Sequence, residues 1–67
     1  MEAADKARVE ARLREKHDRA KRNLQKLEID LTGTKLDHQK ERIYSLMVYH
    51  LDAKARARIA LEELDKL

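Results

Sequence analysis

The sequence predicts an all-α protein, an antiparallel two-helix hairpin of the coiled-coil type. The chain of 67 residues is rich in Ala, Glu, Lys, Leu and Arg and has no Pro, Phe or Trp, a composition typical of long helices and coiled coils. Its apolar residues recur at spacings of three and four, which is the period of a helix. The single glycine, Gly33, lies at the middle of the chain and marks one turn between two helices.

The first helix is predicted at about 2–31, the turn at 32–34 and the second helix at about 35–66, within one domain that covers 1–67. The apolar positions of the first helix are Leu13, Ala20, Leu24, Leu27 and Leu31. An unbroken heptad would continue through Thr34, His38, Glu41 and Ser45, which are all polar. One continuous helix is the alternative, because an interior glycine costs only about 1 kcal/mol, but the change of phase favours a turn.

The turn is predicted from "DLTGTKLD", residues 30–37. Gly33 is expected to take the left-handed conformation that commonly closes a helix. Thr34, followed three residues later by Asp37, resembles a capping box at the start of the second helix.

The second helix restarts the apolar pattern at Leu36, Ile43, Leu46, Ala53, Ala57, Ala60, Leu64 and Leu67. A fold about Gly33 brings together residues whose numbers sum to about 67, such as Leu24 with Ile43 and Ala20 with Leu46. Lys6, Glu10, His17 and Gln39 also fall on this seam. Burial of a Leu side chain stabilises the fold by only about 1.5–3 kcal/mol, whereas ordering each residue costs conformational entropy. We therefore expect the hairpin to need a partner surface.

A second set of apolar residues on the second helix supplies such a surface. Positions 43–51 carry no fixed charge, although charged residues make up 43% of the chain. One set of residues, here called the apolar stripe, lies within an arc about 80° wide that faces away from the seam; it consists of Tyr44, Val48, Leu51, Ala55 and Ile59. The expected interaction face is this stripe together with Ile43, Leu46 and Met47. It predicts a homo-oligomer, with a dimer of hairpins as a four-helix bundle favoured, or docking of another helical protein.

The first helix carries a row of cations, here called the basic ridge, which is a candidate anion-binding surface. The ridge consists of Arg8, Arg12, Arg19, Arg22 and Lys26, extends about 27 Å and spans about 80° of the helix. The simpler interpretation is a solvated face neutralised in part by Glu15 with Arg19 and Asp18 with Arg22. The net charge is only +3, and the two tyrosines offer little base stacking, so nucleic acid is a less favoured partner.

His17 and His50 fall in one layer of the predicted register and form a candidate pH-sensitive layer. Two neutral, hydrogen-bonded imidazoles are the simplest interpretation. Without cysteine the pair is an incomplete zinc site, and we expect neither a metal nor a cofactor.

We do not expect an enzyme, because the sequence has no nucleophile elbow, cysteine or glycine-rich phosphate loop. Three function classes remain. The favoured class is an oligomerisation or scaffold module. The alternatives are a partner-binding hairpin, for example an effector of a small GTPase, and a small basic nucleic-acid-binding bundle. We expect an intracellular, cytoplasmic chain, because the sequence shows neither a signal-peptide pattern nor a membrane span.

Overall fold

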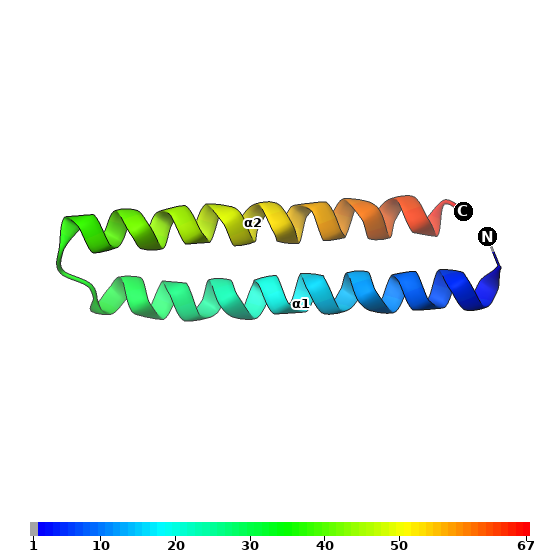
Figure 1. Cartoon of the computed structure of the whole chain (residues 1–67), viewed down its shortest axis with the longest axis horizontal. Helices are drawn as coiled ribbons and strands as arrows, with labels where there is room; N and C mark the ends of the chain where they lie inside the picture. Colours follow the sequence, from blue (N-terminus) through cyan, green and yellow to red (C-terminus); the bar gives the residue numbers. More distant parts are fainter. Residues whose placement is uncertain (1) are drawn as a thin grey trace.

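The protein is a hairpin of two long helices. The computed structural model describes residues 2–67, in which α1 (Ala3–Gly33) and α2 (Asp37–Asp65) run side by side in opposite directions. The connection at residues 34–36 lies at one end of the rod, and the two termini lie at the other (Figure 1). The predicted all-α hairpin is confirmed.

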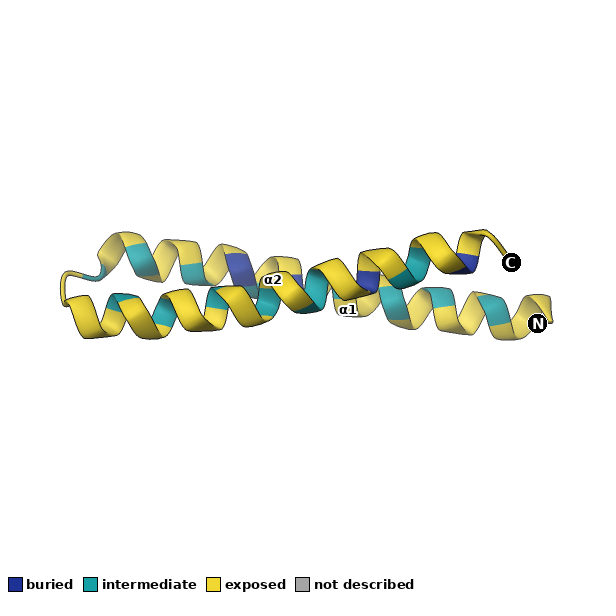
Figure 2. Cartoon of the chain, turned by 90° about the horizontal axis from the view of Figure 1, so that it is seen from above, coloured by how far each residue is buried: buried dark blue, intermediate teal, exposed yellow. Residues whose placement is uncertain are grey.

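The molecule is a rod that measures 51 × 14 × 11 Å, with a Cα radius of gyration of 15.4 Å. A compact chain of this length would have a radius of gyration of about 11 Å. The helices cross at a shallow angle along their length (Figure 2), as helices with a near-heptad apolar repeat do. The rod therefore has no interior beyond the strip along which α1 meets α2.

The C-terminal end of α1 is capped by other groups than the sequence predicts. Gly33 does not have a positive φ and is the last residue of α1. Two threonine hydroxyls bind carbonyls of the final turns instead, because Thr32 donates to the Ile29 carbonyl at 2.7 Å and Thr34 donates to the Asp30 carbonyl at 2.7 Å. Thr34 itself is extended, with φ −97° and ψ 129°. The left-handed glycine was therefore a wrong prediction.

The start of α2 also lacks the predicted capping box. Leu36 occupies the N-cap position and makes no side-chain cap bond. Asp37 lies in the first turn, where its charge complements the helix dipole. Thr34 takes no part in this cap, since its hydroxyl is bound to the end of α1.

The core is small and lies along the line of contact between the helices (Figure 2). The buried side chains are Ala20, Leu24, Ala57 and Leu64. The other apolar side chains of this strip are half-buried: Leu13, Leu27, Leu31, Ile43, Met47, Ala53, Ala60 and Leu61. The polar residues of α1 that were predicted on the seam are half-buried as well: Lys6, Glu10 and His17.

The register of the hairpin differs from the prediction by about one helical turn. Ala20 shares a groove with His50, and Leu24 shares a groove with Met47, so facing residues have numbers that sum to about 70. The cause is local, because α1 ends two residues later and α2 begins two residues later than predicted. Four residues predicted on the seam are exposed: Leu36, Gln39, Leu46 and Leu67. Met47 and Leu61 take seam positions instead, and His50, which was predicted on the seam, is half-buried there.

Ion pairs among the described residues stay within one helix. Arg14 pairs with Glu10, Arg19 with Glu15, Arg56 with Asp52, Arg58 with Glu62 and Lys66 with Glu63. Apart from Glu10, which is half-buried, these partners are solvent-exposed, and such pairs contribute about 0.3–0.5 kcal/mol each to helix stability. In residues 2–67 neither an ion pair nor a side-chain hydrogen bond joins α1 to α2, so apolar contact holds the hairpin together.

Gly33→Ala is expected to stabilise the hairpin by about 0.4–1 kcal/mol. The added Cβ would meet nothing within 4 Å, the backbone φ is negative, and alanine has the higher helix propensity. Urea unfolding followed by circular dichroism at one fixed protein concentration measures the change. A loss of stability would contradict the helical conformation of this residue.

Leu24→Ala is expected to lower the free energy of unfolding by about 2–3 kcal/mol, because it opens a cavity in the small core. Leu36→Ala is the matched control, since Leu36 is 53% exposed whereas Leu24 is 8% exposed. The control should change stability by less than about 1 kcal/mol. Equal losses in the two variants would show that Leu36 belongs to the seam, as the original register required.

Candidate interaction surfaces

The apolar stripe of α2 lies on the outside of the hairpin. Its four large side chains, Tyr44, Val48, Leu51 and Ile59, are between 52% and 65% exposed, and Ala55 is exposed as well. From Tyr44 to Ile59 the stripe runs about 22 Å along the helix. Helix α1 packs against the seam side of α2, so it does not cover the apolar stripe.

The remaining residues of the predicted interaction face are divided between two sides of α2. Ile43 and Met47 are half-buried on the seam, whereas Leu46 is 44% exposed. The structure therefore brings the stripe together as one surface but separates Leu46 from it. Met47 and Leu51 also line a groove of about 320 Å³ between the helices, with Leu24 at its floor and Lys21, Gln25, Glu28 and Lys54 around it.

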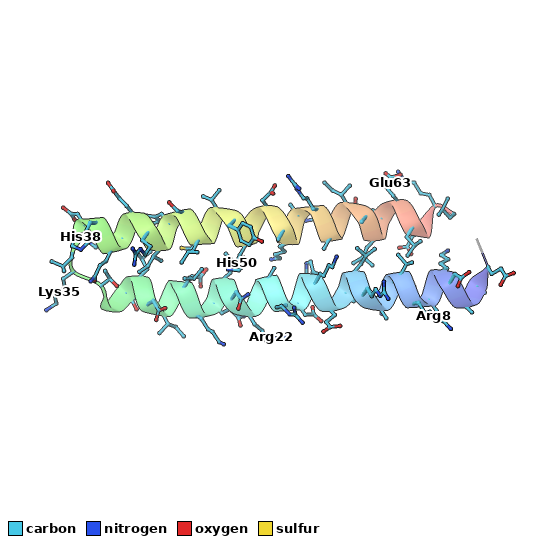
Figure 3. The ribbon with its side chains drawn as sticks, in the orientation of Figure 1. Arg8, Arg22, Lys35, His38, His50 and Glu63 are labelled. Atoms are coloured by element: carbon cyan, nitrogen blue, oxygen red, sulfur yellow. The ribbon has the colours of Figure 1, made fainter. Side chains whose placement is uncertain are left out.

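The basic ridge lies on the solvent-exposed surface of α1. All five residues of the ridge are exposed, and Figure 3 shows Arg8 and Arg22 projecting from α1 away from the other helix. Arg19 pairs with Glu15 at 3.1 Å, as predicted. Asp18 lies 3.5 Å from the His17 ring and forms no ion pair with Arg22 among the described residues. Four of the five cations of the ridge thus have no carboxylate partner within residues 2–67.

The two histidines occupy different surroundings. His17 Nδ1 lies 3.5 Å from an Asp18 carboxylate oxygen. His50 is half-buried on the side of α2 that faces α1 (Figure 3), and its ring meets the Tyr49 ring edge-on at a centroid distance of 5.2 Å. The groove that His50 lines contains Ala20 and Asn23 and does not contain His17. The pH-sensitive layer depended on the earlier register and stays a prediction.

A groove that sequence reasoning missed lies on the other side of the seam from the apolar stripe. This surface, here called the tyrosine groove, has a volume of about 260 Å³ and is lined by Lys16, Arg19, Ala20, Asn23, Tyr49, His50 and Ala53. A second hollow of about 360 Å³ shares Lys16 and Ala53 with it and continues toward Leu13, Arg56 and Ala60. Small alanines leave this space open, and the run of alanines at 53, 55, 57 and 60 was the available signal.

Within residues 2–67, the His, Asp and Glu side chains form no group of three that could hold a metal ion. Neither helix of the described chain contains a stretch apolar enough to cross a membrane.

Comparison of the sequence with models of protein families, with curated proteins and with solved structures finds no match.

Proposed function

We propose that this protein is an oligomerisation module in which two copies of the hairpin pair through the apolar stripe of α2. The observation that carries the proposal is the exposure of four large apolar side chains in one continuous row, 52–65% each, whereas only four of the described residues are buried. A row of this length is uncommon on the surface of a stable monomer, and it usually marks an interaction site.

The accessible surface of the hairpin supports the same proposal. A compact monomer of 7.9 kDa exposes about 4,400 Å², whereas this chain exposes 5660 Å². The excess of about 1,200 Å² is larger than the roughly 800 Å² that each partner buries in a standard interface. One interface with a second copy would bring the exposed surface of each chain close to that of a compact protein.

The surroundings of the stripe suit a second copy of the same chain. In a two-fold dimer the same patch meets itself, so the patch must be complementary to itself. Apolar residues satisfy this condition, and the groove beside the stripe carries both charge signs, with Lys21 and Lys54 near Glu28. Pairing through α2 would produce a four-helix bundle with α1 on the outside.

Val48→Glu is expected to weaken self-association by at least about 100-fold, because it buries a charge in the middle of the interface. Sedimentation equilibrium over a wide range of concentrations measures the molar mass of the variant and of the unmodified chain. We expect the unmodified chain to sediment as a dimer and the variant as a monomer.

Ile29→Glu is the control, because it places the same charge on an exposed apolar position of α1 that is 71% exposed and lies outside the stripe. This variant should keep the dimer mass. A monomeric unmodified chain would refute self-association, and a dimeric Val48→Glu variant would show that a different surface carries it.

A further inference from the structure

The tyrosine groove combines a charge and a shape that the proposed oligomerisation does not use. Cations of both helices line the groove and its continuation, namely Lys16 and Arg19 from α1 and Arg56 from α2. Among residues 2–67, no Asp or Glu side chain lines either hollow. Arg19 and Arg56 are each bound to a carboxylate on their own helix, at 3.1 and 3.0 Å. Lys16 takes part in no ion pair within residues 2–67 and is the free cation of the groove.

The basic ridge extends the positive charge of the groove along α1. Arg19 belongs to both surfaces, and Arg12 lies about 20° from Arg19 on the helix wheel, two turns away along the axis. Arg8, Arg12, Arg22 and Lys26 are exposed and have no carboxylate partner within the described residues. A ligand seated in the groove would therefore meet further cations along one direction, as an extended polyanion requires.

The groove also holds the more exposed of the two tyrosine rings. Tyr49 is 68% exposed, against 53% for Tyr44, and its ring lies at 82° to the His50 ring, with the centroids 5.2 Å apart. Asn23 lines the same groove, and its amide carries both donors and an acceptor. An aromatic face, an amide and neighbouring cations are the elements by which proteins hold an unpaired base and its phosphate.

We propose that the tyrosine groove binds single-stranded nucleic acid, with one base stacked on Tyr49 and the flanking phosphates on Lys16 and the basic ridge. An acidic protein helix would match the cations but would make no use of the exposed aromatic face. The size of the hollow, about 260 Å³, suits one nucleotide rather than a duplex.

This binding is independent of the proposed dimer. Tyr49 and Tyr44 are separated by about 140° around α2, so pairing through the apolar stripe leaves the groove open on each hairpin. The Val48→Glu variant keeps every residue of the groove, and where circular dichroism shows that it retains its helices it should bind the same ligand, which separates a failure of this proposal from a failure of the dimer.

The test is the binding of a fluorescein-labelled oligothymidine to the full chain, followed by fluorescence anisotropy at several salt concentrations between about 50 and 200 mM. Tyr49→Ala is expected to weaken binding about tenfold or more, because stacking on one aromatic ring is worth that factor. Tyr44→Ala is the matched control, since it removes the other exposed tyrosine from the opposite side of α2, and it should leave binding unchanged.

A second pair of variants tests the charge. Lys16→Glu and Lys21→Glu change the net charge equally, but Lys16 lines the tyrosine groove and Lys21 lines the groove beside the apolar stripe. We expect Lys16→Glu to weaken oligothymidine binding severalfold more than Lys21→Glu. Circular dichroism of each variant confirms that the helices are retained.

Heparin and polyglutamate distinguish other ligands. Heparin has the charge without the bases, so its affinity should not depend on Tyr49, and polyglutamate should fail to displace the oligonucleotide. The proposal is overturned if the unmodified chain does not bind oligothymidine, if the two tyrosine variants behave alike, or if heparin binding falls equally in Tyr49→Ala. Displacement by polyglutamate would assign the groove to an acidic protein ligand instead.

Discussion

Helix α1 can cover only one side of α2, and the rest of the structure follows from this constraint. Two helices meet along a single strip, and here that strip buries four side chains among residues 2–67. The described ion pairs lie within one helix or the other, so they support each helix without joining the two. Helix α2 has more apolar surface than α1 can cover, and its outer row remains in contact with water.

The polar positions on the seam have a structural consequence. Lys6, Glu10 and His17 are half-buried in the N-terminal half of α1, so at the open end of the hairpin the buried side chains come from α2, at Ala57 and Leu64. The buried residues lie at Ala20 and Leu24 on α1 and at Ala57 and Leu64 on α2. A second hairpin against α2 would reinforce this end as well as the middle, because the apolar stripe continues to Ile59.

The two sides of the seam differ in a way that suits two different partners. On one side the apolar stripe adjoins a groove with charges of both signs, which favours a copy of the same chain. On the other side the small residues Ala20 and Ala53 open a groove that cations and Tyr49 surround. The seam thus separates the surface that we propose for assembly from the surface that we propose for an anionic ligand, and α2 contributes to both.

The sequence by itself determined the two helices, the turn near Gly33 and the rows of apolar and basic residues, because these features depend on helical periodicity within one segment. It did not determine the register. The Thr34 hydroxyl donates to the Asp30 carbonyl at the end of α1. Helix α1 ends two residues later than predicted, and α2 begins two residues later than predicted. Only the tertiary structure decided which residues of α1 and α2 meet, because pairing depends on where both helices end. This register leaves Leu46 exposed, places His50 opposite Ala20 and forms the groove beside Tyr49. No pattern within a single helix specifies these contacts.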